Sequence, residues 1–356
     1  MFRLLAVADG YLPAVSPKPA DPSAGSVSFI LRPHNLDKRD PALVLKGRVL
    51  DEEGKPIENA LVEPFGKTVN GGSQFGGLTG FDPLALTNSN GEFRLAVPEA
   101  GLAVHLNVSA PAFAPRNFLA IPSGPKPSDL KLLAGVTVTG RVVKNGKPLP
   151  GVAMGIAQQN HNVETCLGHF DAATDQNGVF RILNVPPQDV FALYGQMESM
   201  KALGALELRG VTIGASGSTE NLGDLEVKPG LRLSGRVVLA DGRAVPTGTR
   251  AMISRPEAWD SQQALVGKDG GFSFIGLPAE RYSLSVNVRG YHLSPKNSSA
   301  DLLNGFSLLG VVHENIEGLR LLMEPGREPA RNEDRFSQSN LKEYERRRDA
   351  PLRGID

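Results

Sequence analysis

Cysteine and tryptophan are almost absent from this chain of 356 residues, which has one of each. A single cysteine excludes an intrachain disulfide framework, but it does not identify the compartment, because many exported β-domains have none. No apolar run approaches the roughly 18 residues that a membrane-spanning helix needs. Basic and acidic side chains are equal in number, at 38 each, so the sequence predicts no general attraction to nucleic acid or anionic lipid.

Glycine and proline are abundant instead, with 40 and 27 residues, and they predict many turns between short strands. One pattern occurs three times. Each copy has Gly-Arg-Val, a glycine-containing turn, a basic residue near a proline, and then alternating apolar residues. The copies are "LKGRVLDEEGKPIENALV" (45–62), "VTGRVVKNGKPLPGVAM" (138–154) and "LSGRVVLADGRAVPTGTRAMI" (233–253). Their spacing gives a unit of about 95 residues, the size of one small domain.

A polar, glycine-containing turn followed by Phe also recurs in each unit. The three turns are "TNSNGEFRL" (87–95), "TDQNGVFRI" (174–182) and "GKDGGFSF" (267–274). Such turns join the strands of hairpins, because glycine tolerates the positive φ that they need. The apolar residues around them alternate with a period of two, which is typical of half-buried antiparallel strands. With about seven strands per unit, we predict an all-β fold of tandem antiparallel β-sandwiches, joined like beads on a string.

These units divide the chain into five parts. Residues 42–134, 135–229 and 230–325 are the three sandwich repeats, 326–356 a charged and largely disordered tail, and 1–34 the end of a further repeat whose beginning is missing. The last assignment rests on "FRLLAVADGYLPAVSPK" (2–18), which parallels "YSLSVNVRGYHLSPK" (282–296) in the third repeat. Asp9 and Gly10 interrupt its apolar run too early for a signal peptide.

The second unit carries a resemblance to a known family. Its segments "GRVVKNGKPLPGV" (140–152) and "TDQNGVFRILNVPP" (174–187) resemble the carboxypeptidase regulatory-like family. That family is similar to the transthyretin-like accessory domain of metallocarboxypeptidases and to the B-type repeats of bacterial collagen adhesins. The resemblance extends over about residues 42–325 and implies prealbumin-like, non-catalytic sandwiches that are usually exported and in tandem. Its motifs are mostly turn and core residues, so they identify a fold better than a function.

Side chains that can bind zinc gather in "HNVETCLGH" (161–169), where His161, Cys166 and His169 are candidate metal ligands beside Glu164. In a regular strand Cys166 and His169 face opposite sides, so their convergence requires a bent loop. The alternative is an ordinary polar loop in which Cys166 is a small buried hydrophobe. The sequence indicates no cofactor.

The only tryptophan, Trp259, lies in the polar, proline-containing stretch 255–263. A tryptophan there can act as a plate on which a sugar ring stacks, with Gln262 or Gln263 bonding its hydroxyls and Tyr291 as a second plate. The alternative is a tryptophan that covers an edge of the sandwich core.

Catalytic motifs are missing, since the sequence has no Gly-x-Ser-x-Gly elbow, phosphate-binding loop or His-Glu-x-x-His. We therefore predict that the chain is not an enzyme. We expect a structural or interaction protein, a monomeric rod in the cell envelope or outside the cell, with a glycan or a protein as ligand. The alternatives are an array of carbohydrate-binding modules and the accessory region of a larger enzyme whose catalytic domain lies upstream.

Overall fold

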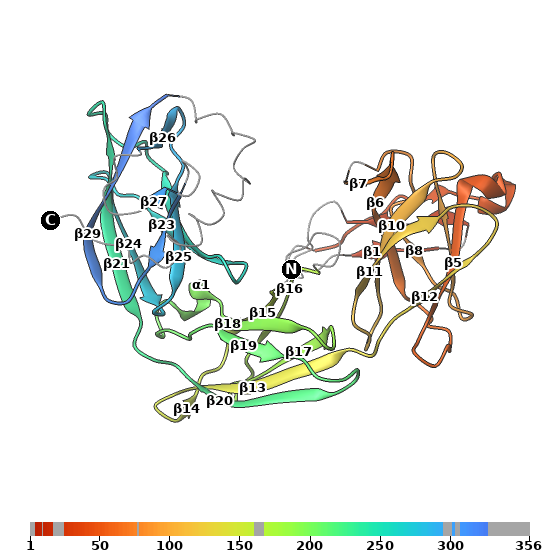
Figure 1. Cartoon of the computed structure of the whole chain (residues 1–356), viewed down its shortest axis with the longest axis horizontal. Coiled ribbons are helices and arrows are strands. Elements are labelled where there is room, and N and C mark those ends of the chain that lie inside the picture. The colour runs from red at the N-terminus through yellow and green to blue at the C-terminus, as the bar shows by residue number, and fades with distance from the viewer. Residues whose placement is uncertain are drawn as a thin grey trace.

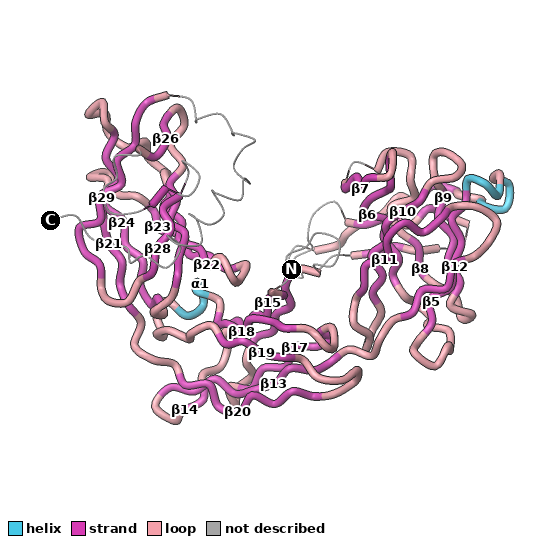
Figure 2. The backbone as a smooth tube through the Cα atoms, in the orientation of Figure 1, coloured by secondary structure: helices cyan, strands magenta, loops and turns pink. Residues whose placement is uncertain are grey.

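The computed structural model describes residues 4–326, except 9, 17–24, 77, 160–166, 295–300 and 303–306 (Figures 1 and 2). Three β-sandwiches follow one another along these residues, which confirms the predicted all-β fold. The second sandwich, yellow to green in Figure 1, lies between the first and the third, and the three together form an open arc. The predicted rod is therefore bent. The predicted tail, 326–356, lies outside the described residues beyond Gly326.

The first sandwich pairs a three-stranded sheet, β12-β5-β9, with a sheet of order β11-β10-β6-β7 in which β8 also pairs with β6. Their bounds are β5 (Val44–Leu50), β6 (Leu61–Val69), β7 (Gly72–Phe75), β8 (Ala85–Leu86), β9 (Glu92–Ala96), β10 (Ala103–Ser109), β11 (Arg116–Pro122) and β12 (Ser128–Lys131). The core between the sheets includes Leu45, Leu106 and Leu132, each fully buried.

The second sandwich repeats this arrangement, with β14-β13-β17 and β20 in one sheet and β16-β15-β18-β19 in the other. Their bounds are β13 (Val136–Lys144), β14 (Lys147–Pro148), β15 (Ala153–Gln158), β16 (His169–Ala173), β17 (Val179–Val185), β18 (Val190–Gly195), β19 (Arg209–Thr212) and β20 (Thr219–Glu226). A one-turn helix, α1 (Met197–Met200), follows β18.

The third sandwich has sheets of order β24-β21-β29-β26 and β23-β22-β25-β28-β27. Their bounds are β21 (Leu231–Leu239), β22 (Arg250–Arg255), β23 (Asp260–Leu265), β24 (Gly271–Leu277), β25 (Arg281–Val286), β26 (Tyr291–Leu293), β27 (Asp301–Leu302), β28 (Ser307–Val311) and β29 (Ile316–Pro325). In all three repeats the closing strand pairs parallel with the opening strand, a detail that the prediction of antiparallel sheets missed. The closing strand arrives from the opposite sheet, so it can take the free edge of the opening strand in the same direction.

Segments before the first sandwich form two short ladders, β1 (Leu5–Ala6) with β3 (Ala14–Val15) and β2 (Tyr11–Leu12) with β4 (Arg32–Pro33). Two 3-10 turns, Leu36–Lys38 and Pro41–Leu43, then lead into β5. This lead-in is fixed to the first sandwich, since His34 Nε2 lies 2.9 Å from Asp82 Oδ2 and Arg39 donates to the carbonyl of Val97. That residues 1–34 end a further repeat stays a prediction.

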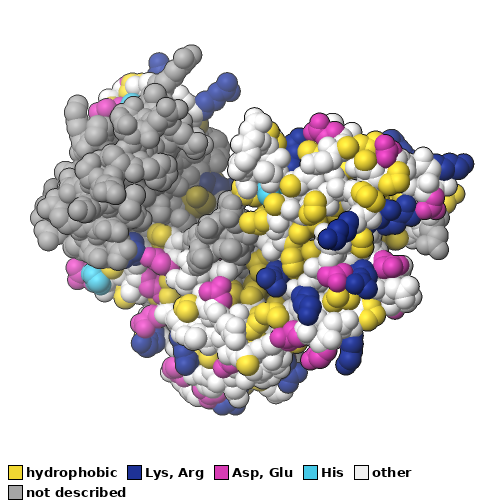
Figure 3. Space-filling view, turned by 45° about the vertical axis from the view of Figure 1, so that its right-hand side comes forward, with side chains coloured by type: hydrophobic (Ala, Val, Ile, Leu, Met, Phe, Trp, Pro, Cys, Tyr) yellow, Lys and Arg dark blue, Asp and Glu magenta, His cyan; other side chains and the backbone are white. Residues whose placement is uncertain are grey.

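The glycine of each Gly-Arg-Val motif lies opposite a phenylalanine in the paired strand. Gly47 pairs with Phe93, Gly140 with Phe180 and Gly235 with Phe272. A Cβ at Gly47 would lie 2.6 Å from the Phe93 ring and 2.6 Å from the Ser128 carbonyl oxygen. In the first two repeats the glycine and the later Phe therefore form one packing contact, whereas at Gly235 the backbone of Leu319 leaves no room for a side chain. On the face shown in Figure 3, basic and acidic side chains are interspersed, as the balanced composition suggests.

Candidate functional site

Of the three candidate metal ligands, only His169 lies among the described residues. It is the first residue of β16 and is exposed. His161 and Cys166 fall within 160–166, outside the described residues. In the described part of the chain, no three His, Cys, Asp or Glu side chains come close enough to hold a metal ion. The zinc site stays a prediction, because two of its three residues lie outside the described part of the chain.

The structure places the three candidate sugar-binding residues in different surroundings. Trp259 lies in the turn between β22 and β23 and is 55% exposed. Gln262, on β23, is buried, and its Nε2 donates to the carbonyl of Ile275 at 3.2 Å. Tyr291 belongs to β26, in the other sheet, and its hydroxyl donates to Asp241 Oδ2 at 2.7 Å. The buried amide of Gln262 is therefore not presented beside the exposed indole.

A different group of residues is brought together where the second and third repeats meet. Helix α1 lies at this joint, and its two methionines enter different cores. Met197 belongs to the core of the third repeat and Met200 to that of the second, and both are 1% exposed. The third sandwich thus rests on α1 as well as on the linker after β20, which accounts for the bend between the two repeats.

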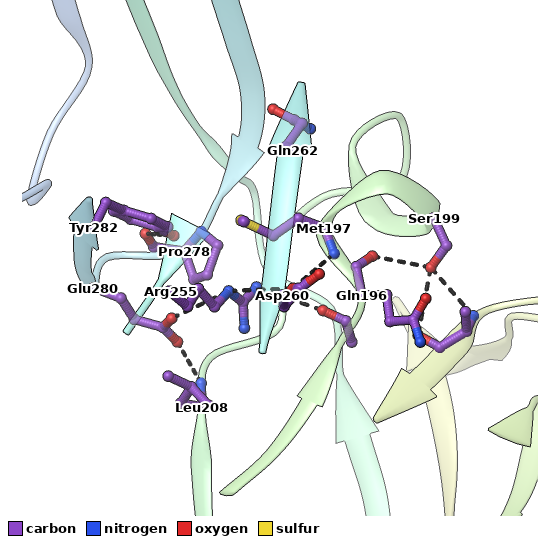
Figure 4. A network of polar contacts seen from close by, with 12 residues as sticks. Gln196, Met197, Ser199, Leu208, Arg255, Asp260, Gln262, Pro278, Glu280 and Tyr282 are labelled. Atoms are coloured by element: carbon purple, nitrogen blue, oxygen red, sulfur yellow. Dashed lines mark hydrogen bonds and ion pairs between the residues drawn. The ribbon is translucent and has the colours of Figure 1, made fainter. Parts of the chain in front are cut away.

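Three buried charged side chains lie between Met197 and Leu208 (Figure 4). Arg255 ends β22, Asp260 begins β23 opposite it, and Glu280 precedes β25. Arg255 Nε lies 3.6 Å from Asp260 Oδ2 and 3.5 Å from Glu280 Oε2. The side chains of these residues are 1%, 7% and 10% exposed. We call these three residues the charged cluster.

Each member of the charged cluster belongs to the third repeat and contacts the second. Asp260 Oδ2 accepts from the Met197 N–H at 3.0 Å, and Glu280 accepts from the N–H of Leu208 (Figure 4). The Arg255 guanidinium lies 6.0 Å from the centroid of the Tyr194 ring, within reach of a cation–π interaction. These contacts hold the two repeats together through backbone groups and one aromatic ring.

Burial dominates the electrostatics of the charged cluster. It raises the pKa of Asp260 and of Glu280, and the positive charge of Arg255 opposes both shifts. Burial also raises the pKa of the Tyr194 hydroxyl to about 12. Two carboxylates face one guanidinium, so proton uptake by one carboxylate neutralises the cluster. Because these side chains are buried, a substrate has no access to them, and their role is to hold the two repeats together.

A polar rim surrounds the cluster. Arg281 Nη1 lies 2.5 Å from Glu257 Oε1, and the Glu257 carbonyl accepts from Gln159 Nε2 of the second repeat at 3.2 Å. On the other side, Glu198 Oε1 accepts from the Gln263 N–H at 3.0 Å. The joint therefore has an apolar contact and hydrogen bonds at its rim, as protein interfaces do, and it also has a buried charged centre, which the cores of interfaces usually lack.

The joint between the first and second repeats is built differently. Ser216 Oγ lies 2.6 Å from Glu52 Oε2 and 3.2 Å from the Ala134 carbonyl oxygen, and it donates its single proton to the nearer carboxylate. Each of these two repeats keeps its own core, and no cluster of buried residues in the described chain includes both. Only the second joint thus has shared apolar packing and buried charge.

The sequence interpretation missed the charged cluster, although it singled out the stretch that holds two of its members. In "RPEAWDSQQ" (255–263), the sequence analysis singles out Trp259 and its neighbouring glutamines and gives no role to Arg255 or Asp260. Their burial depends on α1 and on Leu208, which are far away in the sequence. The sequence does contain one indication of this cluster, because the oppositely charged Arg255 and Asp260 flank a tight turn.

Comparisons with known proteins add little to this description. No family model matches the chain and no curated protein matches it in sequence, so the resemblance to the carboxypeptidase regulatory-like family is not confirmed. Among solved structures, a streptococcal ancillary pilin is 11% identical with a TM-score of 0.27, covering 79% of this chain and 99% of its own. The minor pilin GBS52 of Streptococcus agalactiae is 12% identical, with a TM-score of 0.27, covering 56% and 99%.

The Bacillus anthracis TIE protein is 14% identical to this chain, with a TM-score of 0.22 over 79% of it. This chain spans half the length of the TIE protein. At TM-scores of this size, the likenesses do not extend to function or location. Within the described residues, no helix is both long and apolar enough to cross a membrane.

Proposed function

We propose that this chain is a non-catalytic structural protein of the cell surface, in which joined sandwiches hold a fixed arrangement and present their outer faces to partners. One observation carries the proposal: at the joint between the second and third repeats, the buried charged cluster of the third accepts hydrogen bonds from two backbone N–H groups of the second. Arg255 is 2% exposed, and breaking a buried ion pair by removing one partner costs about 3–5 kcal/mol.

Shared packing at α1 supports the same function. Met197 is part of the third core although its backbone belongs to the second repeat. A domain pair that only needs a tether has no use for this, because a short flexible linker would suffice. A protein that transmits force or spaces a ligand needs a joint that does not open.

The test compares the two joints by distance measurements between spin labels. In a Cys166→Ser background, one pair of labels at Asn177 and Lys268 spans the second joint, and another pair at Lys55 and Asn177 spans the first. All three positions are exposed. We expect a narrow distance distribution across the second joint, which broadens when Arg255 is replaced by Ala. Equally broad distributions across both joints in the unmodified chain would refute the fixed arrangement.

Location is tested separately, on cells that make the chain naturally. Brief protease treatment of intact cells is expected to remove it while cytosolic proteins stay whole. Full protection of the chain until the cells are lysed would overturn the surface assignment.

A further inference from the structure

An ion pair recurs on the outer sheet face of the first two repeats. Arg48 lies opposite Asp129 on the paired strands β5 and β12, and Arg141 lies opposite Asp224 on β13 and β20. Both pairs are bidentate. Arg48 Nε and Nη2 each lie 2.9 Å from an oxygen of Asp129, and the corresponding distances from Arg141 to Asp224 are 2.9 and 2.5 Å. The acid on the closing strand neutralises the arginine of Gly-Arg-Val.

The third repeat lacks this acid. Arg236 is its Gly-Arg-Val arginine, and the register of β21 and β29 places Arg320 directly opposite. Like charges in directly opposed positions destabilise a sheet, and adjacent strands are only about 4.8 Å apart. Arg320 thus lowers the stability of the sheet at a position where the other two repeats have an ion pair. We infer that its exposed positive charge has a function.

A groove lies over this pair of arginines, and it is lined by residues of β21, β24 and β29, the end of β23 and the turn before β24. The strands β24, β21 and β29 lie side by side in the third sandwich (Figure 1). The volume of the groove is about 1000 Å³. The residues of its lining that matter here are Arg232, Arg236 and Arg320, with Ser234, Ser273 and Leu265. Arg232, Ser234 and Arg236 share one face of β21, because side chains alternate along a strand. We call this surface the arginine groove.

Charge in the arginine groove is only partly balanced. Arg236 Nη2 lies 3.3 Å from Asp269 Oδ2, and both side chains are more than 60% exposed. Arg232 Nε donates to the Ser273 hydroxyl at 3.2 Å. Among the described residues, no carboxylate pairs with Arg320, and Asp269 is the one acid in the groove lining. Three guanidinium groups thus face one carboxylate, in a chain whose net charge is zero.

We propose that the arginine groove binds an extended acidic segment of a partner protein. A guanidinium matches a carboxylate in a bidentate, planar contact. Because a strand rises about 3.3 Å per residue, Arg232 and Arg236 stand about 13 Å apart along β21. Carboxylates four residues apart in an extended acidic segment have the same spacing and share a face, so both arginines can be paired at once.

Two other modes of recognition fit the groove less well. The strands that carry the three arginines, β21 and β29, are each paired on both edges, so a partner that lies over them binds through side chains and not as an added strand. Phe272, the aromatic residue of the lining, is 5% exposed, which leaves no open ring on which a neutral sugar could stack. Charge is therefore the feature to be recognised.

Binding is measured by fluorescence anisotropy of a labelled peptide of alternating Glu and Thr, with a Gln and Thr peptide as the neutral control. We expect the Glu peptide to bind, to weaken as salt is raised, and to bind at least about tenfold more weakly to the variant Arg320→Asp. That variant restores the ion pair of the first two repeats, so it is expected to fold. The matched control is Arg289→Asp, which makes the same charge change at an exposed arginine outside the groove.

Three results would overturn the proposal. Equal losses of affinity in Arg320→Asp and Arg289→Asp would mean a general charge effect. Equal binding of the Glu and Gln peptides would exclude carboxylate recognition. Tighter binding of polygalacturonate than of the Glu peptide, at equal carboxylate concentration, would assign the groove to an acidic polysaccharide. This proposal rests on the proposed function, because it assigns a class of partner to the outer face of one sandwich. It concerns the third repeat alone, so it can be wrong while the proposal of a fixed joint between the second and third repeats remains correct.

Discussion

The guanidinium of Arg255 in the third repeat lies 6.0 Å from the centroid of the Tyr194 ring in the second. Both residues are almost fully buried. A charge buried at a boundary between two domains is unfavourable unless both sides supply partners. Here the third repeat supplies Asp260 and Glu280, and the second supplies the aromatic ring and two backbone N–H groups. The two sandwiches are therefore interdependent at this point.

Replacing Arg255 by Ala is expected to destabilise the third repeat by about 3–5 kcal/mol, because two buried carboxylates lose their counter-charge. Fluorescence of Trp259, the sole tryptophan, reports this unfolding during titration with denaturant, separately from the other repeats. Arg250→Ala is the matched control, since Arg250 lies on the same strand and is exposed. It should change stability by less than about 0.5 kcal/mol. Similar small effects of both substitutions would contradict the role of the cluster.

Mild acidification is expected to strengthen the second joint. The pKa of Asp260 and of Glu280 is raised in the folded state, so the folded chain binds protons at a pH at which the unfolded chain has released them. The contribution of these groups to stability therefore falls as pH rises from the ordinary carboxylate range through the raised pKa. The free energy of unfolding, followed by Trp259 fluorescence, should therefore depend on pH with a different slope in the wild type and in Asp260→Asn. The same pH dependence in both proteins would show that Asp260 does not titrate in this range.

Substitution of the three Gly-Arg-Val glycines by Ala is expected to destabilise the repeats to different degrees. The added Cβ would lie 2.1 Å from the Leu319 carbonyl oxygen at Gly235 and 2.6 Å from that of Ser128 at Gly47. At Gly140 its nearest neighbours, in the Phe180 ring, are 3.0 Å away. Hydrogen exchange of each repeat should therefore accelerate least for Gly140→Ala. A larger effect at Gly140 than at Gly235 would contradict this packing explanation.

A buried threonine, Thr174, stabilises the turn between β14 and β15 in the second repeat. Thr174 Oγ1 donates to the Leu149 carbonyl at 2.7 Å and accepts from the Val152 N–H at 2.8 Å. Thr174→Val leaves both backbone groups without this partner, so we expect a loss of about 1–3 kcal/mol. Hydrogen exchange in β15 and β17 is the measurement. Thr219→Val, at an exposed position of β20, is the control and should have little effect.

Neutral sugars are expected to leave the fluorescence of Trp259 unchanged. The side chain of Gln262 is buried and its Nε2 donates to the Ile275 carbonyl, and Tyr291 lies on the other sheet. A titration with neutral oligosaccharides tests this directly. Saturable quenching that is lost in Trp259→Ala but kept in Gln262→Ala would establish a sugar site on the indole alone.

Sequence patterns predicted the fold where the determinants are local. Alternation with a period of two marked the strands, and the glycine-containing motifs marked the tight turns before Phe93 and Phe180. The prediction that these turns close hairpins was wrong, because the strands they join, β8 with β9 and β16 with β17, belong to opposite sheets. The parallel closing strands were missed, because their pairing joins residues such as Val49 and Leu130 that no local pattern connects. The charged cluster was missed for the same reason, since Arg255 is buried by Tyr194 and α1 of another repeat.

By itself, the sequence determined the tandem order of three sandwiches, because each repeat contains the turns and apolar alternation that build its own core. Only the tertiary structure decided which charged residues are buried and which are paired. Arg48, Arg141 and Arg236 have the same place in their motifs, yet two of them face an aspartate and the third faces Arg320. The register of strands more than eighty residues apart sets that difference, because electrostatic partners are chosen by distance in space.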